Sequence, residues 1–482
     1  MSLVEWLVGV PWMMWAILVP LIGAVCVFLL PKRTALVGLV TALLTAASAL
    51  AVLFQVAVGG TRTYQLGGWG APLGIDLMAD GLSVLMLAMT AIVGVGVSVY
   101  ARVYLASSPH KVRRFWALWL FLWAALNGLF QAGDVFNLYV TLELMGLSAV
   151  ALVALTGSGP ALWGAMRYLL VSLLGSLAYL LGVALLYHAY GTLDLTLLGE
   201  RANGGLLLAV PMGAMIAGLL LKTGLFPFHV WLPLAHGSAR APVSALLSGL
   251  VVKASFYLVL RLWFTFLPEG EALPMLLGSL GAAAIFWGSV QALRQNRLKL
   301  LVAYSTVAQL GYLFLAFPLA GGMDPALAWA GSIYLALSHA LAKGAMFLAA
   351  GSIMTQIGHD DIDGLDRIAD RMPLTLTAFA LAGISLAGLP PSGGFVGKWM
   401  LLQSATAQGM WFWAFVMIVG GLLTATYVFR VLGFAFTESD HKREANEVPP
   451  TMEWTALLLA LGAVLLGFAA PWTLPLLDGV LP

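Results

Sequence analysis

The chain has 482 residues, of which 61% are hydrophobic and only 9% are charged. Because soluble domains average about 25% charged residues, this composition excludes a soluble globular protein and indicates an integral membrane protein. The net charge of +2 gives no reason to expect nucleic acid as a partner, and the one cysteine, Cys26, excludes disulfides and cysteine-ligated metal or iron–sulfur sites within the chain.

The hydrophobic pattern predicts an all-α polytopic membrane protein with about fourteen transmembrane helices. A span requires about 20 apolar residues. Runs of that size lie at 12–30, 35–58, 77–100, 115–132, 135–156, 162–187, 205–225, 243–265, 273–293, 299–318, 326–354, 374–406, 411–436 and 453–474. The first run is too long for the core of a signal peptide and is expected to be a retained span.

Two of these runs contain helix-breaking residues. Pro227 interrupts the seventh, and GLPPSGGF from Gly388 to Phe395 interrupts the twelfth, so each is expected to form two half-helices. The segment HVWLPLAHGSARAP after Pro227 is expected to be a short, partly re-entrant connection. Spans 4–8 and 9–13 then form two inverted five-helix repeats, each broken at its fourth helix, which is a recurring transporter plan. The predicted divisions of the chain are 1–112, 113–265, 266–436 and 437–482.

The positive charges of the connecting loops predict the orientation. Arg62 and Arg201 lie on even-numbered connections, whereas thirteen residues lie on odd-numbered ones: Lys32, Arg33, Arg102, Lys111, Arg113, Arg114, Arg294, Arg297, Lys299, Arg367, Arg371, Lys442 and Arg443. Because cytoplasmic loops collect Lys and Arg, both termini are expected outside, in the inner (plasma) membrane of a bacterium or archaeon. The polar segments 355–372 and 437–450 would then be cytoplasmic, as solvated loops or as docking sites for a partner protein.

Five ionisable side chains lie deep inside predicted spans: Glu143, which is the only carboxylate so placed, and Lys222, Lys253, Lys343 and Lys398. A charge at the bilayer centre costs about 2.5–3.5 kcal/mol on insertion scales, so these groups must face one another, water or a polar interior. A static pair of Glu143 with one lysine would leave three lysines unexplained. A chain of titratable groups explains all of them, because a desolvated lysine can take and release a proton.

Three histidines fit the same interpretation. His339 precedes Lys343 by four residues, so both side chains share one helix face, where a proton relay is a better explanation than two structural cations. His229 and His236 flank the break in the seventh span, where a structural histidine and a relay member are equally expected.

Three arginines near the ends of spans receive a different interpretation. Arg167, Arg261 and Arg430 have stems long enough for the guanidinium to reach the membrane interface, and Arg167 is also a candidate relay residue. The sequence contains no zinc-spaced pair, no phosphate-binding loop and no Ser–His or Cys–His set. We therefore expect no catalytic residue, metal or cofactor site in this chain.

Six ordered motifs carry a resemblance to a known family: GDVFNLYVTLEL, LKTGLFPFHVWLPLAH, PVSALLSGLVVKASFY, LKLLVAYSTVAQLGY, HALAKGAMFLAAG and GLPPSGGFVGKW. They resemble the antiporter-like, proton-conducting subunits shared by respiratory complex I, Mrp-type cation/proton antiporters and membrane-bound hydrogenases, over about residues 70 to 435. The resemblance implies a fourteen-helix fold with inverted five-helix repeats. It also implies that proton transfer is carried by Glu143, Lys222, Lys253, His339, Lys343 and Lys398.

The motifs also bear on the subfamily. NLYV before Glu143 and the lysine at Lys398 resemble the D component of Mrp-type antiporters, whereas WLPLAH with SALLSG looks more like hydrogenase-associated subunits. The preferred function is a proton-translocating, Mrp D-like subunit of an ion-pumping complex. The alternatives are a subunit of a complex I-type NADH-quinone oxidoreductase or hydrogenase, a stand-alone secondary transporter, and a structural subunit with an inactive channel. The expected partners are other membrane subunits, the lipid bilayer and protons, with Na⁺ as an ion that the whole assembly could exchange.

Overall fold

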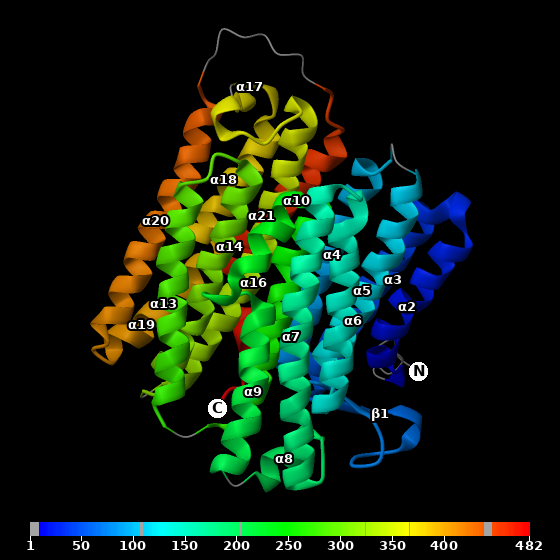
Figure 1. Ribbon diagram of the computed structural model, residues 1–482, viewed down its shortest axis with the longest axis vertical. Coiled ribbons are helices and arrows are strands. Elements are labelled where there is room, and N and C mark those ends of the chain that lie inside the picture. The colour runs from blue at the N-terminus through cyan, green and yellow to red at the C-terminus, as the bar shows by residue number, and fades with distance from the viewer. Residues whose placement is uncertain are drawn as a thin grey trace.

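The computed structural model describes residues 9–106, 109–202, 204–268, 270–322, 324–365, 367–437 and 446–482. These residues form a bundle of helices, most of which run along its long axis (Figure 1). Twelve helical segments in the described ranges are long and apolar enough to cross a membrane. The chain is therefore a multi-pass membrane protein, as its composition predicts.

The first part of the chain forms three helices and a β-hairpin: α2 (Trp12–Leu29), α3 (Thr34–Gly59), β1 (Arg62–Gln65), β2 (Asp76–Ala79) and α4 (Gly81–Tyr104). The two strands pair antiparallel, with Arg62 opposite Ala79. The third span was expected to begin at residue 77, but it begins at Gly81 because Asp80 caps the helix and accepts a hydrogen bond from Ser83 N at 2.9 Å.

The second part contains a broken helix. Its helices are α5 (Pro109–Gln131), α6 (Val135–Val153), α7 (Gly159–Tyr190), α8 (Leu195–Arg201), α9 (Leu206–Thr223), α10 (Leu232–Ser238), α11 (Ala241–Leu246) and α12 (Val252–Phe266). α9 ends at Gly224, whose φ of 72° is left-handed, and the 3₁₀ turn η4 (Phe228–Trp231) leads into α10. The predicted re-entrant connection was wrong, because η4 and α10 complete one span over Leu206–Ser238.

The third part contains the second broken helix. Its helices are α13 (Ala272–Leu293), α14 (Leu298–Phe314), α15 (Ala316–Leu319), α16 (Pro325–Ile357), α17 (Ile368–Arg371), α18 (Pro373–Ala387), α19 (Gly393–Ala407), α20 (Trp411–Ala435) and α21 (Pro450–Thr473). The predicted twelfth span is divided into α18 and α19. Gly388 ends α18 with a φ of 83°, and the Ser392 hydroxyl caps α19 by accepting from Phe395 N at 3.2 Å. Each of the fourteen predicted runs thus corresponds to a helix or a broken helix.

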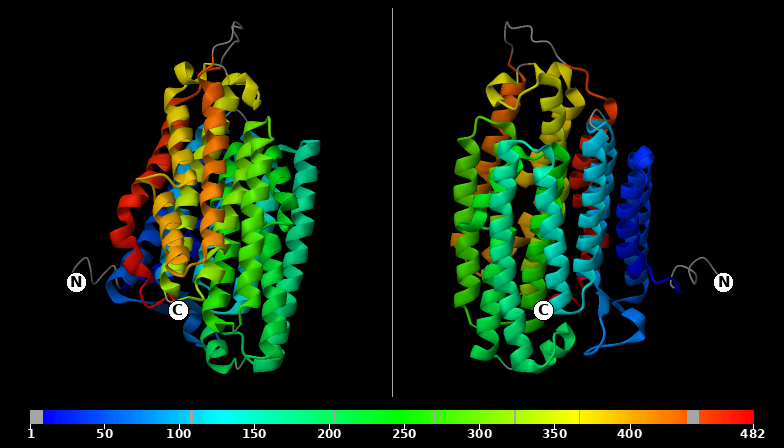
Figure 2. Two further views of the ribbon diagram at one scale, coloured as in Figure 1. Left: turned by 90° about the vertical axis from the view of Figure 1, so that its left-hand side faces the viewer. Right: turned by 45° about the vertical axis from the view of Figure 1, so that its right-hand side comes forward.

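The two ends of the bundle differ in the elements they carry. α17 lies at one end, called here the α17 end, whereas β1 and α8 lie at the other, called the β1 end (Figure 1). α2 begins and α21 ends towards the β1 end, and the side views agree (Figure 2). Lys442 and Arg443, two of the thirteen residues used to predict the orientation, lie outside the described residues.

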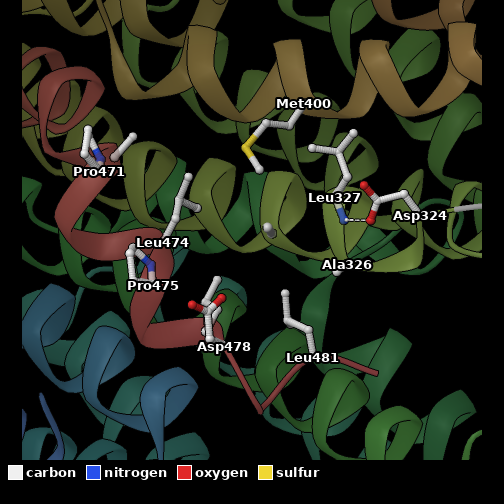
Figure 3. A pocket seen from close by; sticks show the side chains of 12 residues that line it. Asp324, Ala326, Leu327, Met400, Pro471, Leu474, Pro475, Asp478 and Leu481 are labelled. Carbon is white, nitrogen blue, oxygen red and sulfur yellow. Dashed lines mark hydrogen bonds between the residues drawn. The ribbon is translucent and has the colours of Figure 1, made fainter.

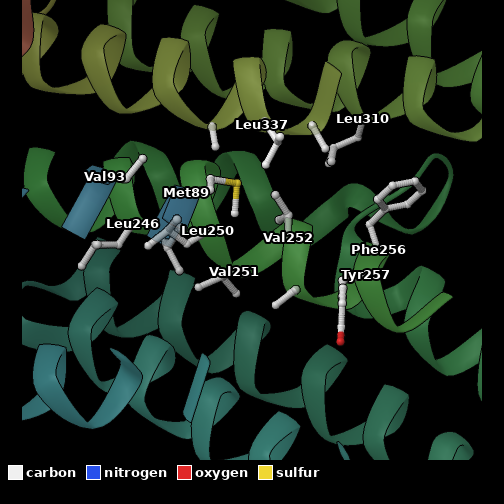
Figure 4. Packing of buried hydrophobic residues seen from close by; sticks show 14 of the residues in the cluster. Met89, Val93, Leu246, Leu250, Val251, Val252, Phe256, Tyr257, Leu310 and Leu337 are labelled. Atoms are coloured by element: carbon white, nitrogen blue, oxygen red, sulfur yellow. The ribbon is translucent and has the colours of Figure 1, made fainter. Parts of the chain in front are cut away.

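The core of the bundle surrounds two helical segments. In each of the spans Ala241–Phe266 and Pro325–Ile357, an 18-residue stretch is entirely buried, so the polar side chains in it face other helices instead of lipid. Between them, apolar residues of α12 such as Val252 pack towards Leu310 of α14 and Leu337 of α16 (Figure 4). Lys253, His339 and Lys343 belong to these enclosed segments.

Candidate functional site

Glu143 of α6 and Lys222 of α9 form an ion pair inside the bundle. Lys222 Nζ lies 3.1 Å from Glu143 Oε1 and donates to Ser172 Oγ at 3.0 Å. Ser176 Oγ donates to the same carboxylate oxygen. The lysine side chain is only 3% exposed, whereas the glutamate side chain is 21% exposed. The structure thus brings together two residues that lie two spans apart in the sequence.

A close crossing of α7 and α9 holds Lys222 in place. A Cβ added to Gly218 would lie 2.2 Å from Gly175 O, and one added to Gly175 would lie 3.1 Å from Lys222 Cγ. Small residues let membrane helices approach closely, so the lysine stem lies against α7 and reaches Ser172. Lys222 also lies in the last turn of α9, where the helix dipole stabilises a cation.

Lys253 of α12 and Lys343 of α16 bind residues that both contact Thr306 of α14. Lys253 Nζ donates to Ser248 O, and Ser248 Oγ lies 2.8 Å from Thr306 Oγ1. Thr306 donates to Val302 O at 3.0 Å, and Lys343 Nζ donates to the same carbonyl at 3.0 Å. Both lysine side chains are completely buried. The polar contacts of the two lysines therefore converge on neighbouring residues: Lys253 binds Ser248, Lys343 binds Val302, and Thr306 is bonded to both of these residues.

A π-helical segment precedes Lys253. This segment, η5 (Leu247–Val251), joins α11 to α12 and contains Ser248, the residue whose carbonyl binds the lysine. Within η5, a Cβ added to Gly249 would lie 3.3 Å from Ala340 O of α16. π-Helical segments frequently occur at functional sites, and this one lies where α12 meets α16.

Two buried histidines accompany these lysines. His339 of α16 is 1% exposed and His236 of α10 is completely buried. Within the described ranges, no protein group is hydrogen-bonded to either ring nitrogen of either histidine. The positive charges of Lys253 and Lys343 interact electrostatically with both imidazoles. Imidazoles without a fixed partner can gain or lose a proton without breaking a structural hydrogen bond.

Lys299 is a buried cation that the sequence pattern missed. It was expected in a cytoplasmic loop, but it lies in the first turn of α14 and is only 3% exposed. Its Nζ donates to the carbonyl oxygen of Ala239, the residue that follows α10. Its positive charge also interacts electrostatically with His236. A lysine at the end of an apolar run is normally solvated, so only the packing of α10 against α14 reveals it.

Lys398 lies beside the break between α18 and α19. Its Nζ donates to Leu386 O at 2.6 Å and to Ala387 O at 3.4 Å, and it lies 4.0 Å from the centre of the Tyr312 ring. The ammonium therefore caps the last carbonyls of α18. Lys398 follows its break, whereas Lys222 precedes the break in the seventh span.

A serine pair connects His339 to this break. Ser338, the neighbour of His339, lies 2.8 Å from Ser385 in the last turn of α18, Oγ to Oγ. The charge of Lys398 also reaches His339. α16, which carries Lys343, is therefore linked through Ser338 to α18, whose last carbonyls hold Lys398.

Two cavities lie near these elements. One of about 240 Å³ lies beside Lys398 and is lined mainly by apolar residues of α19 and α20 such as Trp399 and Met417. A larger one of about 530 Å³ lies near the C-terminal end of the chain, where Asp324 and Asp478 line it (Figure 3). The larger cavity contains none of the predicted proton-transfer residues.

His229 and Arg167 lie apart from this set of contacts. His229 stacks on Phe226 with ring centroids 5.5 Å apart, and its Nδ1 has no hydrogen-bond partner among the described residues. Arg167 is exposed on α7, 4.8 Å from the centre of the Trp163 ring. This position fits a side chain that reaches outwards and gives no support to a relay role for Arg167.

Arg261 does not reach the interface, and that prediction was wrong. It is 6% exposed and forms a bidentate ion pair with Asp80, with both N–O distances at 2.5 Å. Asp80 is 6% exposed, so the structure also buries a carboxylate at the start of α4, which a search for charges deep inside spans does not identify. Arg261 need not reach water, because the carboxylate of Asp80 at the start of α4 neutralises the positive charge of the guanidinium inside the bundle.

Arg430 is partly exposed and donates to Leu293 O at 2.5 Å.

The family of the chain follows from comparison with known proteins. A family model described as "NADH:quinone oxidoreductase/Mrp antiporter, TM" matches residues 132–424. The chain belongs to this family. The matched segment contains the Glu143–Lys222 pair and the buried lysines up to Lys398.

Individual relatives support the same assignment. The chain is 36% identical over 470 residues to NADH-quinone oxidoreductase subunit N of Desulforudis audaxviator, covering 89% of this chain and 93% of the relative. It is 30% identical over 464 residues to the D component of the Na(+)/H(+) antiporter of Alkalihalophilus pseudofirmus, covering 94% and 93%. A chain of the Mrp complex from Dietzia sp. DQ12-45-1b superposes with a TM-score of 0.87 at 25% identity, covering 96% of this chain and 95% of that one.

The similar solved structures are subunits of multi-subunit membrane complexes. The chain is therefore an antiporter-like membrane subunit of the type found in Mrp and complex I-type complexes. The family resemblance and the all-helical membrane fold expected from the sequence are both confirmed.

Proposed function

We propose that this chain translocates protons along a buried axis formed by Glu143, Lys222, Lys253, His339, Lys343 and Lys398. The observation that carries the proposal concerns Lys253, Lys343 and Lys398. Among the described residues, Lys253, Lys343 and Lys398 form no ion pair with a carboxylate, and their hydrogen bonds go to carbonyl and hydroxyl oxygens. A buried ammonium without a counter-charge is costly, so these amines are suited to lose and regain a proton.

The Glu143–Lys222 pair acts as the switch of this axis. While the carboxylate lies 3.1 Å from the ammonium, the lysine retains its proton. When Glu143 moves away, Lys222 loses its counter-charge and releases the proton. Shifting a pKa by two units requires about 2.7 kcal/mol. A membrane potential supplies about 2.3 kcal/mol per charge per 100 mV, so coupling of this size is energetically accessible.

The direction of the path follows from the remaining groups. Protons from the cytoplasmic side load Lys253 or His339, pass through the central polar axis by way of Lys343, and leave through Lys398. The proposed divisions of the chain are 1–112, then the repeats 113–265 and 266–436, and finally 437–482, so that each repeat contains one broken helix. His229 and His236 are proposed as accessory relay members beside the first break.

Two assemblies are consistent with this function. In the first, the chain is an Mrp D-like component that works with other antiporter subunits, in an assembly that exchanges Na⁺ for protons. In the second, it is a proton-pumping component of a complex I-type oxidoreductase, which the 36% identity to an oxidoreductase relative favours over the 30% identity to an antiporter relative. Co-purification of the tagged chain with antiporter subunits or with oxidoreductase subunits distinguishes them.

The proposed function predicts that Lys253→Ala lowers proton transport by the intact complex on the order of 100-fold. The substitution removes the amine that, in this proposal, takes up the proton before Lys343. The measurement is acidification of proteoliposomes with an entrapped pH dye under an imposed potential. Arg167→Gln is the matched control, because that cation is exposed on α7 and should be dispensable. Full transport by Lys253→Ala would contradict the proposal.

We also propose that the β1 end faces the outside of a bacterial or archaeal plasma membrane, so that both termini are external. In a Cys26→Ser background, Glu200→Cys at the end of α8 should react with a membrane-impermeant maleimide on intact cells. Arg371→Cys at the end of α17 should react only after permeabilisation. Both positions are exposed in the structure. The reverse labelling pattern would overturn the orientation.

A further inference from the structure

The proposed proton path leaves one buried ion pair without a role, the pair between Asp80 and Arg261. Besides its two bonds to Asp80, the guanidinium donates from Nε to the Tyr257 hydroxyl at 2.7 Å and from Nη2 to Ser83 Oγ at 2.7 Å. The Tyr257 hydroxyl in turn donates to Phe130 O of α5 at 2.8 Å. The pair therefore joins α4, α5 and α12 through a set of fully engaged groups.

This cluster lies on the face of α12 that carries Lys253. Lys253, Tyr257 and Arg261 follow one another at intervals of four residues, so their side chains share one side of the helix. Figure 4 shows Tyr257 pointing away from Leu310 and Leu337, which are on the side of α14 and α16. Tyr257 therefore lies on α12 between Lys253, the predicted proton carrier, and Arg261 of the ion pair.

The ion pair lies where this face meets the β1 end. Asp80 follows β2 directly and begins α4. Next to it, a Cβ added to Gly81 would lie 1.5 Å from Leu476 O, so the turn η7 (Leu474–Leu477) packs directly over the start of α4. Asp80 is a buried carboxylate that shares the guanidinium of Arg261 with Tyr257, the next polar side chain after Lys253 on this face. It would be the first proton acceptor between Lys253 and the β1 end if it were free.

Arg261 keeps that carboxylate from accepting a proton. Burial acts to raise the pKa of Asp80, but the charge of Arg261 and the hydrogen bonds from Arg261 and Ser83 outweigh it, so the pKa lies below its ordinary value. The ionisable groups that interact with Asp80 in the described residues are Arg261 and Tyr257, both of α12. Arginine itself does not release its proton in proteins.

We infer that Arg261 is a positioning residue that closes the β1 end of α12 to protons by holding Asp80 in a bidentate pair. This inference rests on the proposed function, in which Lys253 carries a proton. With this end closed, a proton on Lys253 passes sideways to Lys343 and on to Lys398. If Arg261 were absent, Asp80 would be a buried carboxylate without a counter-charge and would become a proton acceptor beyond Tyr257.

The test uses Arg261→Gln in the intact reconstituted complex, in a Lys398→Ala background that blocks the proposed exit. Lys398→Ala alone should lower the potential-driven proton flux. Adding Arg261→Gln should raise that flux at least about tenfold, because protons reach the β1 end through Asp80. Adding Asp80→Asn as well should return the flux to the level of Lys398→Ala alone, because the acceptor is then removed.

Each outcome separates the inference from the proposed function. An Arg261→Gln variant without extra flux overturns the closure, and so does extra flux that survives Asp80→Asn, since loosened packing would then explain it. If Lys398→Ala leaves the flux unchanged, the proposed exit fails instead. Arg261→Lys retains a cation but loses the bidentate geometry, so a smaller leak that depends on Asp80 is expected. If the Arg261→Gln variant does not assemble, the Arg261→Lys variant provides the same test.

Discussion

Glu143→Gln is expected to abolish proton transport by the complex, with a loss on the order of 100-fold, while the complex stays assembled. Glutamine retains an oxygen that can accept hydrogen bonds from Ser176 and Lys222, so the local packing changes little. It removes the negative charge that keeps Lys222 protonated. Proteoliposome acidification under an imposed potential measures transport, and the amount of intact complex after purification measures assembly.

Lys222→Ala should cause a loss of the same size, and the double variant should be no worse than either single variant. Residues that act as one unit show such non-additive effects. Ser176→Ala serves as the matched control, because it removes one hydrogen bond to Glu143 but leaves both charges of the pair in place. Additive losses in the double variant, or normal transport in either single variant, would show that the two residues are not a switch.

Lys398→Arg is expected to block proton transport even though it retains a cation. Arginine can still donate to the carbonyls of Leu386 and Ala387 and lie near the Tyr312 ring, but it does not release its proton near neutral pH. The expected loss is again on the order of 100-fold. The same transport measurement on the reconstituted complex checks it.

Lys398→Met complements this test. It removes both the charge and the donor, so the last carbonyls of α18 lose their cap, and a lower thermal stability of the complex is expected. If Lys398 only stabilised the break, the arginine variant would transport normally and the methionine variant would be the impaired one. If Lys398 carries protons, both variants fail in transport, and only the methionine variant also loses stability.

The hydrophobic pattern was sufficient to predict the membrane fold and the two broken helices. A run of about 20 apolar residues has few alternatives to a spanning helix, and proline and glycine mark the breaks at Pro227 and Gly388. The deep charges were recognisable for the same reason, because Lys253 and Lys343 stand out against an apolar background. That Glu143 pairs with Lys222 could be proposed, but the serines that hold the pair could not, since apolar membrane helices carry many serines.

The errors concern residues near the ends of spans. Lys299 was assigned to a cytoplasmic loop, and Arg261 to the interface because a long stem near a helix end normally reaches water. Whether it does depends on the neighbouring helix, and Asp80 lies 181 residues away from Arg261 in the sequence. The short helix α10 was also missed, because seven residues after a proline give too weak a periodic signal to be distinguished from a loop.

The glycine crossing of α7 and α9 makes the two members of the ion pair mechanically unequal. The stem of Lys222 lies against the backbone of α7, its ammonium is bonded to Ser172 of the same helix, and its side chain is 3% exposed. Glu143 lies on α6, keeps part of its side chain exposed, and is flanked on that helix by exposed Val140 and Leu144. The carboxylate is therefore the less enclosed member of the pair, and it is the one that a protein bound to the outer side of α6 would lie nearer to.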